Sequence, residues 1–96
     1  MQVDLKIEKL SQMFNVLGDP NRLNILVFLT EGKKSVSEIT NYIGMSQSAT
    51  SHQLRIMKDA NILKKEKVGK TVYYMIADAH VETIVTNGLV HMFHGE

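Results

Sequence analysis

Residues 36–60 have the sequence VSEITNYIGMSQSATSHQLRIMKDA, and this pattern predicts two helices joined by a short turn. Ser35 or Ser37 can cap the first helix, and Gly44 marks its end because glycine readily adopts the left-handed conformation that follows many helices. Ser46 is placed to cap the second helix. The inward-facing residues of the first helix are expected to be Val36, Ile39 and Ile43.

The second helix has one apolar side and one side of short polar residues. The apolar side comprises Ala49, Leu54, Ile56, Met57 and Ala60. The other side comprises Gln47, Ser48, Ser51, His52 and Arg55. Serine is a mediocre helix former, so this composition is easier to explain if the polar side lies against another surface. Such side chains can reach base edges in a DNA major groove, and the helix N-terminus at Ser46 can accept a phosphate.

A β-hairpin is predicted directly after the second helix. The segments ILKKEKV (62–68) and TVYYMIA (71–77) have strand character and are joined around Gly69 and Lys70. The residues that alternate toward one face are Val72, Tyr74 and Ile76. The hairpin lysines, which can contact DNA phosphates, are Lys64, Lys65, Lys67 and Lys70. For each lysine, simple solubility or protection of a sheet edge remains an alternative.

Two helices precede this region and one follows it. Residues 3–18 show helical spacing, and Asp19 and Pro20 then cap and begin a helix that should run to Gly32 and form the centre of the core. The segment 78–94 is the last helix. The order α-α-α-α-β-β-α predicts a mainly α protein with a β-hairpin, a winged helix-turn-helix in a single domain that spans residues 1–96.

The composition limits the class of protein. The chain has 96 residues, of which 44% are hydrophobic, so it should fold, but a domain this small is short of core unless it associates. No apolar run approaches the ~18 residues that span a membrane, and no signal-peptide pattern is present, so we expect a cytoplasmic protein without a membrane partner. The absence of cysteine excludes disulfides and thiolate metal sites.

The net charge of +1 conceals a local basic region. Residues 46–75 contain six basic and two acidic side chains, whereas the rest of the chain contains five basic and eight acidic ones. A basic patch on an acidic body suits a surface that follows phosphates, although an ordinary solvated face has the same composition.

Three stretches resemble the ArsR/SmtB family of metal-responsive repressors: LGDPNRLNILVFL (17–29), SQSATSHQLRIMKDANIL (46–63) and VGKTVYYMI (68–76). The resemblance extends from about residue 10 to residue 94. It implies a homodimeric winged helix held together by the first and last helices, which represses a metal-efflux or resistance gene by binding operator DNA. It also implies that the recognition-helix face consists of Gln47, Ser48, Ser51 and His52.

The last helix contains the candidate metal ligands Asp78, His80, His91 and His94. At ~100° and ~1.5 Å per residue, the three imidazoles lie along one stripe of the helix. An adjacent stripe, which is expected to pack on the core of the same chain, consists of Val81, Val85, Leu89 and Met92. His80 and His91 are nevertheless ~16 Å apart along the axis, whereas a Zn–N bond is ~2.0–2.1 Å long. A single helix therefore cannot bring all four ligands to one ion.

A symmetric dimer removes this obstacle. If two copies of the helix cross antiparallel near Thr86-Asn87-Gly88, Asp78 and His80 of one chain meet His91 and His94 of the other, and symmetry creates two sites. Three nitrogens and one carboxylate oxygen suit Zn(II), and also Co(II). The spacing D-x-H-x10-H-x2-H resembles that of the CzrA-like zinc and cobalt sensors of the family. We expect the metal bridge to favour an arrangement of the two chains that does not bind DNA, so that metal binding weakens operator binding.

Several alternatives remain open at this stage. Asp78 could act only as a helix cap, and the three histidines could decorate an exposed helix. The regulator could respond to nickel or to a non-metal signal, or be an architectural DNA-binding dimer. A zinc hydrolase is disfavoured because the HxxH pair lacks the glutamate of HExxH, so we expect no enzyme activity and no small-molecule substrate.

Overall fold

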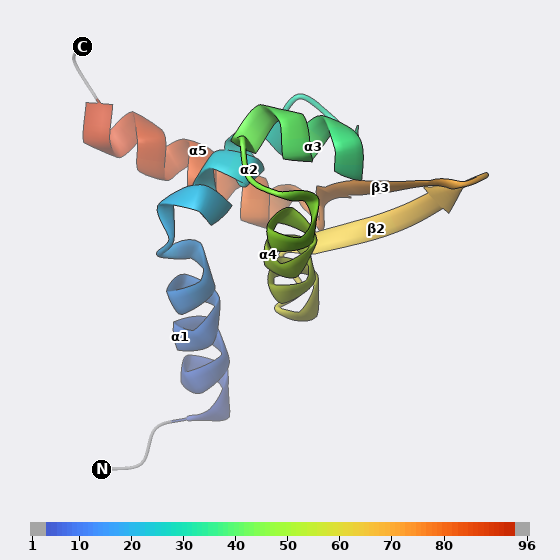
Figure 1. The fold of residues 1–96 in the computed structure, drawn as a ribbon. Helices are drawn as coiled ribbons and strands as arrows, with labels where there is room; N and C mark the ends of the chain where they lie inside the picture. Colours follow the sequence, from blue (N-terminus) through green and yellow to red (C-terminus); the bar gives the residue numbers. More distant parts are fainter. Residues whose placement is uncertain (1–3, 94–96) are drawn as a thin grey trace.

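The computed structural model describes residues 4–93 and contains five helices and three strands within them. Figure 1 shows a helix-turn-helix flanked by a β-hairpin, and the predicted winged helix-turn-helix is confirmed. The elements are α1 Leu5–Leu17, α2 Pro20–Leu29, β1 Lys34–Ser35, α3 Val36–Ile43, α4 Gln47–Asp59, β2 Leu63–Val68, β3 Thr71–Ile76 and α5 Ala79–Phe93.

The sheet has one strand more than the sequence predicted. Lys34 and Ser35 form β1, which pairs antiparallel with Tyr74 and Tyr73 of β3, and the strand order is β1-β3-β2. A strand of two residues is too short to show an alternating pattern. For a related reason α2 ends at Leu29 rather than at Gly32: the residues after it form the turn that carries the chain to β1.

Side-chain caps define the helix ends as predicted. The Asp19 carboxylate accepts a hydrogen bond from the Arg22 N–H at 3.0 Å, and Pro20 occupies the first turn of α2. Ser35, rather than Ser37, caps α3. Ser46 caps α4 by accepting a hydrogen bond from the Ala49 N–H. A side chain therefore fixes the start of each of these three helices.

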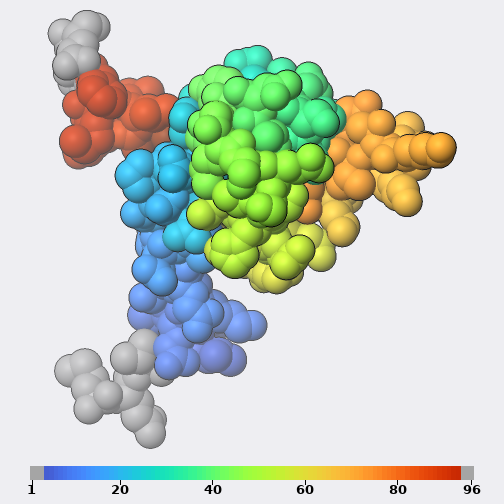
Figure 2. Space-filling model, viewed as in Figure 1, coloured from blue at the N-terminus to red at the C-terminus, as the bar shows by residue number. Residues whose placement is uncertain are grey.

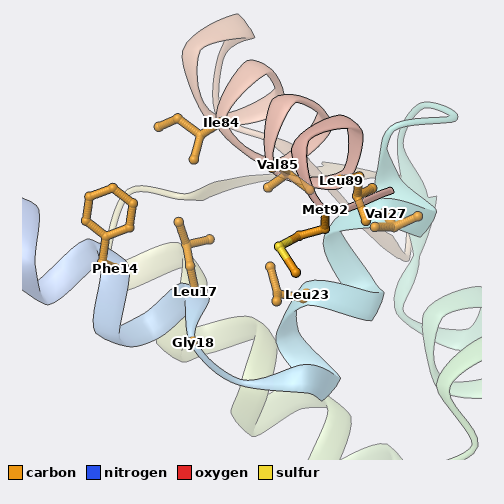
Figure 3. A pocket seen from close by; sticks show the side chains of 10 residues that line it. Phe14, Leu17, Gly18, Leu23, Val27, Ile84, Val85, Leu89 and Met92 are labelled. Atoms are coloured by element: carbon orange, nitrogen blue, oxygen red, sulfur yellow. The ribbon is translucent and has the colours of Figure 1, made fainter. Parts of the chain in front are cut away.

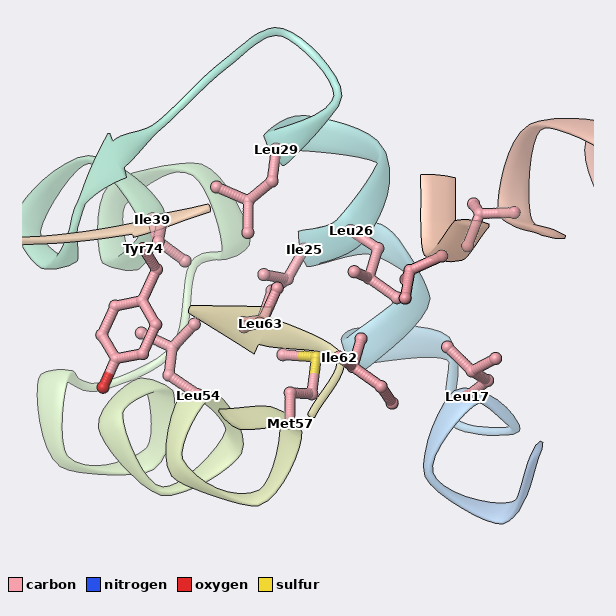
Figure 4. Packing of buried hydrophobic residues seen from close by; sticks show 12 residues of the cluster. Leu17, Ile25, Leu26, Leu29, Ile39, Leu54, Met57, Ile62, Leu63 and Tyr74 are labelled. Carbon is pink, nitrogen blue, oxygen red and sulfur yellow. The ribbon is translucent and has the colours of Figure 1, made fainter. Parts of the chain in front are cut away.

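The core joins α2, α3, α4 and the hairpin to the first turns of α5 (Figure 4). Its members are Leu17, Ile25, Leu26, Leu29, Ile39, Leu54, Met57, Ile62, Leu63, Tyr74, Val81 and Val85. Thr50 is also fully buried, and its hydroxyl donates to the Ser46 carbonyl at 2.9 Å. α4 is therefore anchored along one side, which leaves its opposite side free.

The prediction for the C-terminal half of α5 was wrong. Val81 and Val85 are each only 6% exposed, but Leu89 is 43% and Met92 is 72% exposed. The reason is visible in Figures 1 and 2, where this half of α5 extends beyond the body of the protein, on the side away from the hairpin. The core of the protomer therefore covers only the first turns of the helix.

An apolar groove opens between α1, α2 and the exposed part of α5 (Figure 3). Its volume is about 370 Å³. The residues that line it, defined here as the apolar groove, are Phe14, Leu17, Gly18, Leu23, Val27, Ile84, Val85, Gly88, Leu89 and Met92. α2 thus has one side in the core and another along this groove.

Among the helices within residues 4–93, none combines the length and the apolar character that crossing a membrane requires.

Candidate nucleic-acid interface and metal centre

The polar side of α4 lies on the surface of the body. In Figure 2 this helix (yellow-green) faces the viewer, and the hairpin (orange) projects to one side of it. Gln47, Ser48, His52 and Arg55 are exposed, and Ser51 is half-buried. Because Leu54 and the other core residues of α4 hold the opposite side, these polar side chains are presented by a rigid element rather than by a loop.

The N-terminus of α4 is free of negative charge. The first turn contains no acidic residue, and Ser46 satisfies only the Ala49 N–H. The Ser48 hydroxyl lies 3.4 Å from the Ser46 hydroxyl, so both are directed to the same end of the helix. Unpaired N–H groups and the positive end of the helix dipole are thus available to an anion such as a phosphate.

A polar depression, here called the tip groove, connects α4 to the tip of the hairpin. It is lined by Ser35, Val36, Ser37, Gln47, Ser51, Lys70, Thr71 and Val72. The structure therefore brings together three residues that the sequence predicted as DNA contacts: Gln47, Ser51 and Lys70. It adds Ser37 and Thr71, which sequence reasoning missed because the contact between α3 and the hairpin arises only in the tertiary fold.

The hairpin lysines are divided between the two faces of the sheet. In the antiparallel register Lys65 lies opposite Tyr74, and directly opposite residues share a face. Lys65 and Lys67 therefore lie on the face turned to α4, and Lys65 lines a second groove with Arg55. Lys64 is on the other face. The structure brings Lys65 together with α4, whereas Lys67 shares only its face of the sheet and Lys64 lies on the other face.

At the start of α5, Asp78 and His80 lie side by side. The Asp78 Oδ1 atom accepts a hydrogen bond from the Val81 N–H at 3.1 Å and lies 3.5 Å from the His80 Nδ1 atom. The hydrogen bond from Val81 is the largest influence that lowers the pKa of the Asp78 carboxyl, with smaller contributions from His80 and from the charge of Lys64. The His80 side chain is 93% exposed, so this pair is accessible from outside.

The remaining candidate ligands belong to the other end of the helix. His91 is exposed in the last turn of α5, and His94 lies outside the described residues. At ~1.5 Å per residue, His91 is ~16 Å along the helix from His80. Within residues 4–93, no group of three His, Cys, Asp or Glu side chains lies close enough together to hold a metal ion. Any site that uses both ends of α5 requires a second chain.

Comparison with known proteins gives one family match and several relatives. A family described as "Bacterial regulatory protein, arsR family" matches residues 19–65. A transcriptional repressor SmtB homolog from Synechocystis is 33% identical over 88% of this chain and 64% of the relative. A cadmium resistance transcriptional regulatory protein CadC homolog from Staphylococcus aureus is 37% identical over 84% of this chain and 68% of the relative. The chain thus spans about two thirds of these relatives.

Among solved structures, a similar one comes from Mycobacterium bovis. It is described as the homodimeric winged helix-turn-helix DNA-binding domain of a possible ArsR-family transcriptional regulator. The alignment has a TM-score of 0.86 and 26% sequence identity, and it covers 100% of this chain and 93% of that one.

Proposed function

Because this chain belongs to the arsR family of bacterial regulatory proteins, we propose that it is a metal-responsive transcriptional repressor that binds operator DNA as a homodimer. The observation that carries the proposal is the exposed polar side of α4, bordered by the tip groove and by the basic face of the hairpin. Gln47 and Ser48 supply base contacts, and Lys65, Lys67 and Lys70 supply phosphate contacts. The relatives are transcriptional regulators, and the chain is a regulator rather than an enzyme.

A second copy of the chain would cover the apolar surface of α1 and α5. Both helices expose large hydrophobic side chains that their own protomer covers only in part, and adjacent exposed hydrophobic side chains are typical of a protein interface. The exposed residues are Leu5, Ile7, Leu10, Phe14, Ile84, Leu89, Val90, Met92 and Phe93. The similar structure from Mycobacterium bovis is a homodimer by its description, which supports the same assembly here.

The metal proposed as the signal is Zn(II), with Co(II) as the alternative of similar geometry. Asp78 and His80 of one chain and His91 and His94 of the other would hold it. The donor set fits the ion: the Asp78 carboxyl is kept ionised by its hydrogen bonds, His80 is exposed beside it, and the chain has no cysteine to favour a softer ion. When bound, the metal supplies a bridge between the two α5 helices.

The path from this bridge to the DNA-binding surface is short. α5 follows β3 after only two residues, Ala77 and Asp78, and its first turns are buried in the core through Val81 and Val85. A change in the orientation of α5 therefore acts directly on the hairpin and on the angle between the two protomers. We propose that the metal-bridged orientation is not the one that binds DNA, so metal binding releases the operator and allows expression of metal-efflux or resistance genes.

The experiment that tests the proposal begins with selection of a binding site from random DNA duplexes. Affinity for the selected duplex is then measured by fluorescence anisotropy, with zinc and with a chelator. We expect zinc to weaken binding about a hundredfold, which corresponds to ~2.7 kcal/mol of coupling. Equal affinities under the two conditions would refute the metal switch, and failure to select any sequence would refute specific DNA binding.

A matched pair of variants separates the two halves of the proposal. His91→Ala should bind the selected duplex as the unmodified protein does but should not respond to zinc. Gln47→Ala should bind zinc normally while it loses preference for the selected sequence. If His91→Ala instead prevents dimer formation, His91 has a structural role and the metal assignment fails.

A further inference from the structure

A second groove lies beside the tip groove, between the C-terminal half of α4 and the sheet, and we call it the basic groove. Its polar lining consists of Ser51, Arg55, Lys58, Asp59, Lys65 and Tyr74, and its volume is about 380 Å³. It shares Ser51 with the tip groove, so the two depressions are continuous along one side of α4. Of its polar lining residues, Lys58, Asp59 and Tyr74 are absent from the predicted DNA contacts.

Tyr74 provides an unpartnered polar atom in this groove. The residue is only 8% exposed, and its ring packs in the core (Figure 4). The hydroxyl oxygen points away from the apolar cluster, Tyr74 lines the groove, and the hydroxyl forms no side-chain hydrogen bond within residues 4–93. Burial is the largest cause of the raised pKa of Tyr74, so the hydroxyl stays protonated and can donate a hydrogen bond. The hydroxyl is not among the buried polar atoms that lack a partner within residues 4–93, so it is open to a group that enters the groove.

The charges around this hydroxyl favour an anion. Arg55, Lys58 and Lys65 line the groove against a single carboxylate, that of Asp59. Arg55 and Asp59 lie close enough to shift the pKa of Tyr74 in opposite directions. The groove is thus positive overall, but Asp59 weakens the field inside it.

We propose that the basic groove holds a phosphate of the DNA backbone, with the Tyr74 hydroxyl as hydrogen-bond donor and Lys58 as an ionic contact. This inference rests on the proposed function, because it requires α4 to lie in a major groove. A helix in that groove has a sugar–phosphate strand on each side. The basic groove runs along α4 toward the hairpin, where one of these strands would pass.

A backbone phosphate fits better than a free anion. Arg55 and Lys58 are exposed, so their attraction for a small ion is screened by water and salt. A phosphate that is part of DNA already docked on α4 is presented at a high effective concentration, so a weak local site still contributes.

The first test needs no operator, since backbone contacts are independent of sequence. Binding of a labelled 30-base-pair duplex of random sequence is measured between about 50 and 200 mM salt for Lys58→Gln and for Lys33→Gln. Lys33 is a matched control, because it pairs with Glu66 at 3.7 Å and lies over Tyr73, which is on the other face of the sheet. Relative to the unmodified protein, we expect Lys58→Gln to reduce the magnitude of the slope of log K against log salt by about 0.9, and Lys33→Gln to reduce it less. Equal slopes for the two variants would overturn the proposal.

Two further substitutions cannot be confused with loss of folding. Asp59→Asn should strengthen binding of the same duplex, because it removes the only carboxylate that lines the groove. Its control is Glu66→Gln, which removes the same charge from the opposite face of the sheet and should strengthen binding less. Tyr74→Phe keeps the ring in the core and should weaken binding about threefold to tenfold with no change in salt slope. Equal effects of Asp59→Asn and Glu66→Gln would contradict the proposal.

The outcomes separate this inference from the proposed function. If the unmodified protein binds no duplex, the proposed function fails. If Gln47→Ala loses sequence preference while the variants of Lys58 and Asp59 match their controls, only the backbone contact fails. The remaining case is a site for a small free anion, which a ³¹P NMR titration with inorganic phosphate detects. Suppose that phosphate saturates the protein in the sub-millimolar range, that Lys58→Gln abolishes this binding, and that the salt slopes for duplex binding are unchanged. These results would assign a small-anion site and overturn the proposal.

Discussion

Single side chains fix the start of α3, where the chain leaves β1. Ser35 and Glu38 form a reciprocal pair: the Ser35 Oγ atom accepts from the Glu38 N–H at 3.1 Å, and the Ser35 N–H donates to the Glu38 Oε1 atom at 2.9 Å. These hydrogen bonds lower the pKa of the Glu38 carboxyl, and the bond from the Ser35 backbone is the largest cause. The folded protein therefore favours the ionised form.

This pair predicts how stability depends on pH. Because the pKa of Glu38 is lower in the folded state, its contribution is present above the ordinary value of 4.5 and is lost as pH falls through the lowered folded value. The difference in free energy of unfolding between the unmodified protein and Glu38→Gln should shrink as pH falls below 4.5, which urea unfolding at several pH values measures. In a Ser35→Ala background this dependence should be much weaker. A difference that stays constant with pH would contradict the assignment.

Gly44 provides a prediction for the other end of α3, where the turn to α4 begins. Its φ of 74° lies in the left-handed region, and a Cβ atom there would meet no neighbour within 4 Å. The cost of Gly44→Ala is therefore a backbone cost, which we expect to be ~1–2 kcal/mol of unfolding free energy. Gly44→Asn should cost less, because asparagine tolerates this conformation better than alanine. Thermal or urea unfolding compares the two variants, and equal losses would argue against the backbone explanation.

At the scale of elements, the periodicity of hydrophobic residues predicted each helix within residues 4–93 and the hairpin. It did not predict features that depend on contacts between segments distant in the sequence. The caps at Asp19 and Ser46 and the turn at Gly44 were visible because they depend on residues near in sequence. β1 was not visible, since two residues become a strand only when β3 lies beside them. The exposure of Leu89 and Met92 could not be predicted either, because helical spacing does not show where the body of the protein ends.

The alternation of β2 makes a prediction about adjacent lysines. Lys65 lies on the face of the sheet turned to α4, whereas Lys64 lies on the other face. Lys65→Gln should therefore reduce the salt dependence of duplex binding by about 0.9 in slope, and Lys64→Gln should reduce it less. Anisotropy titrations at several salt concentrations compare the two. Equal reductions would show that DNA contacts both faces of the hairpin.

The exposed half of α5 predicts the effect of an added charge. Met92 is 72% exposed and lines the apolar groove, so Met92→Glu should be harmless to the protomer but should convert dimers to monomers, because it places a charge in the proposed interface. Val68 at the hairpin tip is 49% exposed, and Val68→Glu is the control that should leave the dimer intact. Sedimentation velocity measures both. A dimer that survives Met92→Glu would place the interface elsewhere.

At the scale of the whole molecule, the sequence predicted the types of metal ligand and the need for a second chain. The structure adds the positions of Asp78 and His80 at the start of α5 and of His91 in its last turn. Asp78 and His80 are adjacent because the carboxylate caps the helix on which the imidazole lies. The relative placement of two chains is not encoded in any local pattern, since it depends on the surfaces of α1 and α5 together. The basic groove was hidden for the same reason: α4 and β3 meet only in the folded chain.

The central claim is that two chains share each metal ion, and complementation between two inactive variants tests it most directly. One variant carries Asp78→Ala and His80→Ala, and the other carries His91→Ala and His94→Ala. Neither homodimer has a complete site, but a mixed dimer has one, so random mixing should restore about a quarter of the tetrahedral Co(II) absorption of the unmodified protein. Absorption restored to this level is the predicted result. If mixed dimers are shown to be present and the mixture has no more Co(II) absorption than its two components, the result would contradict a shared site.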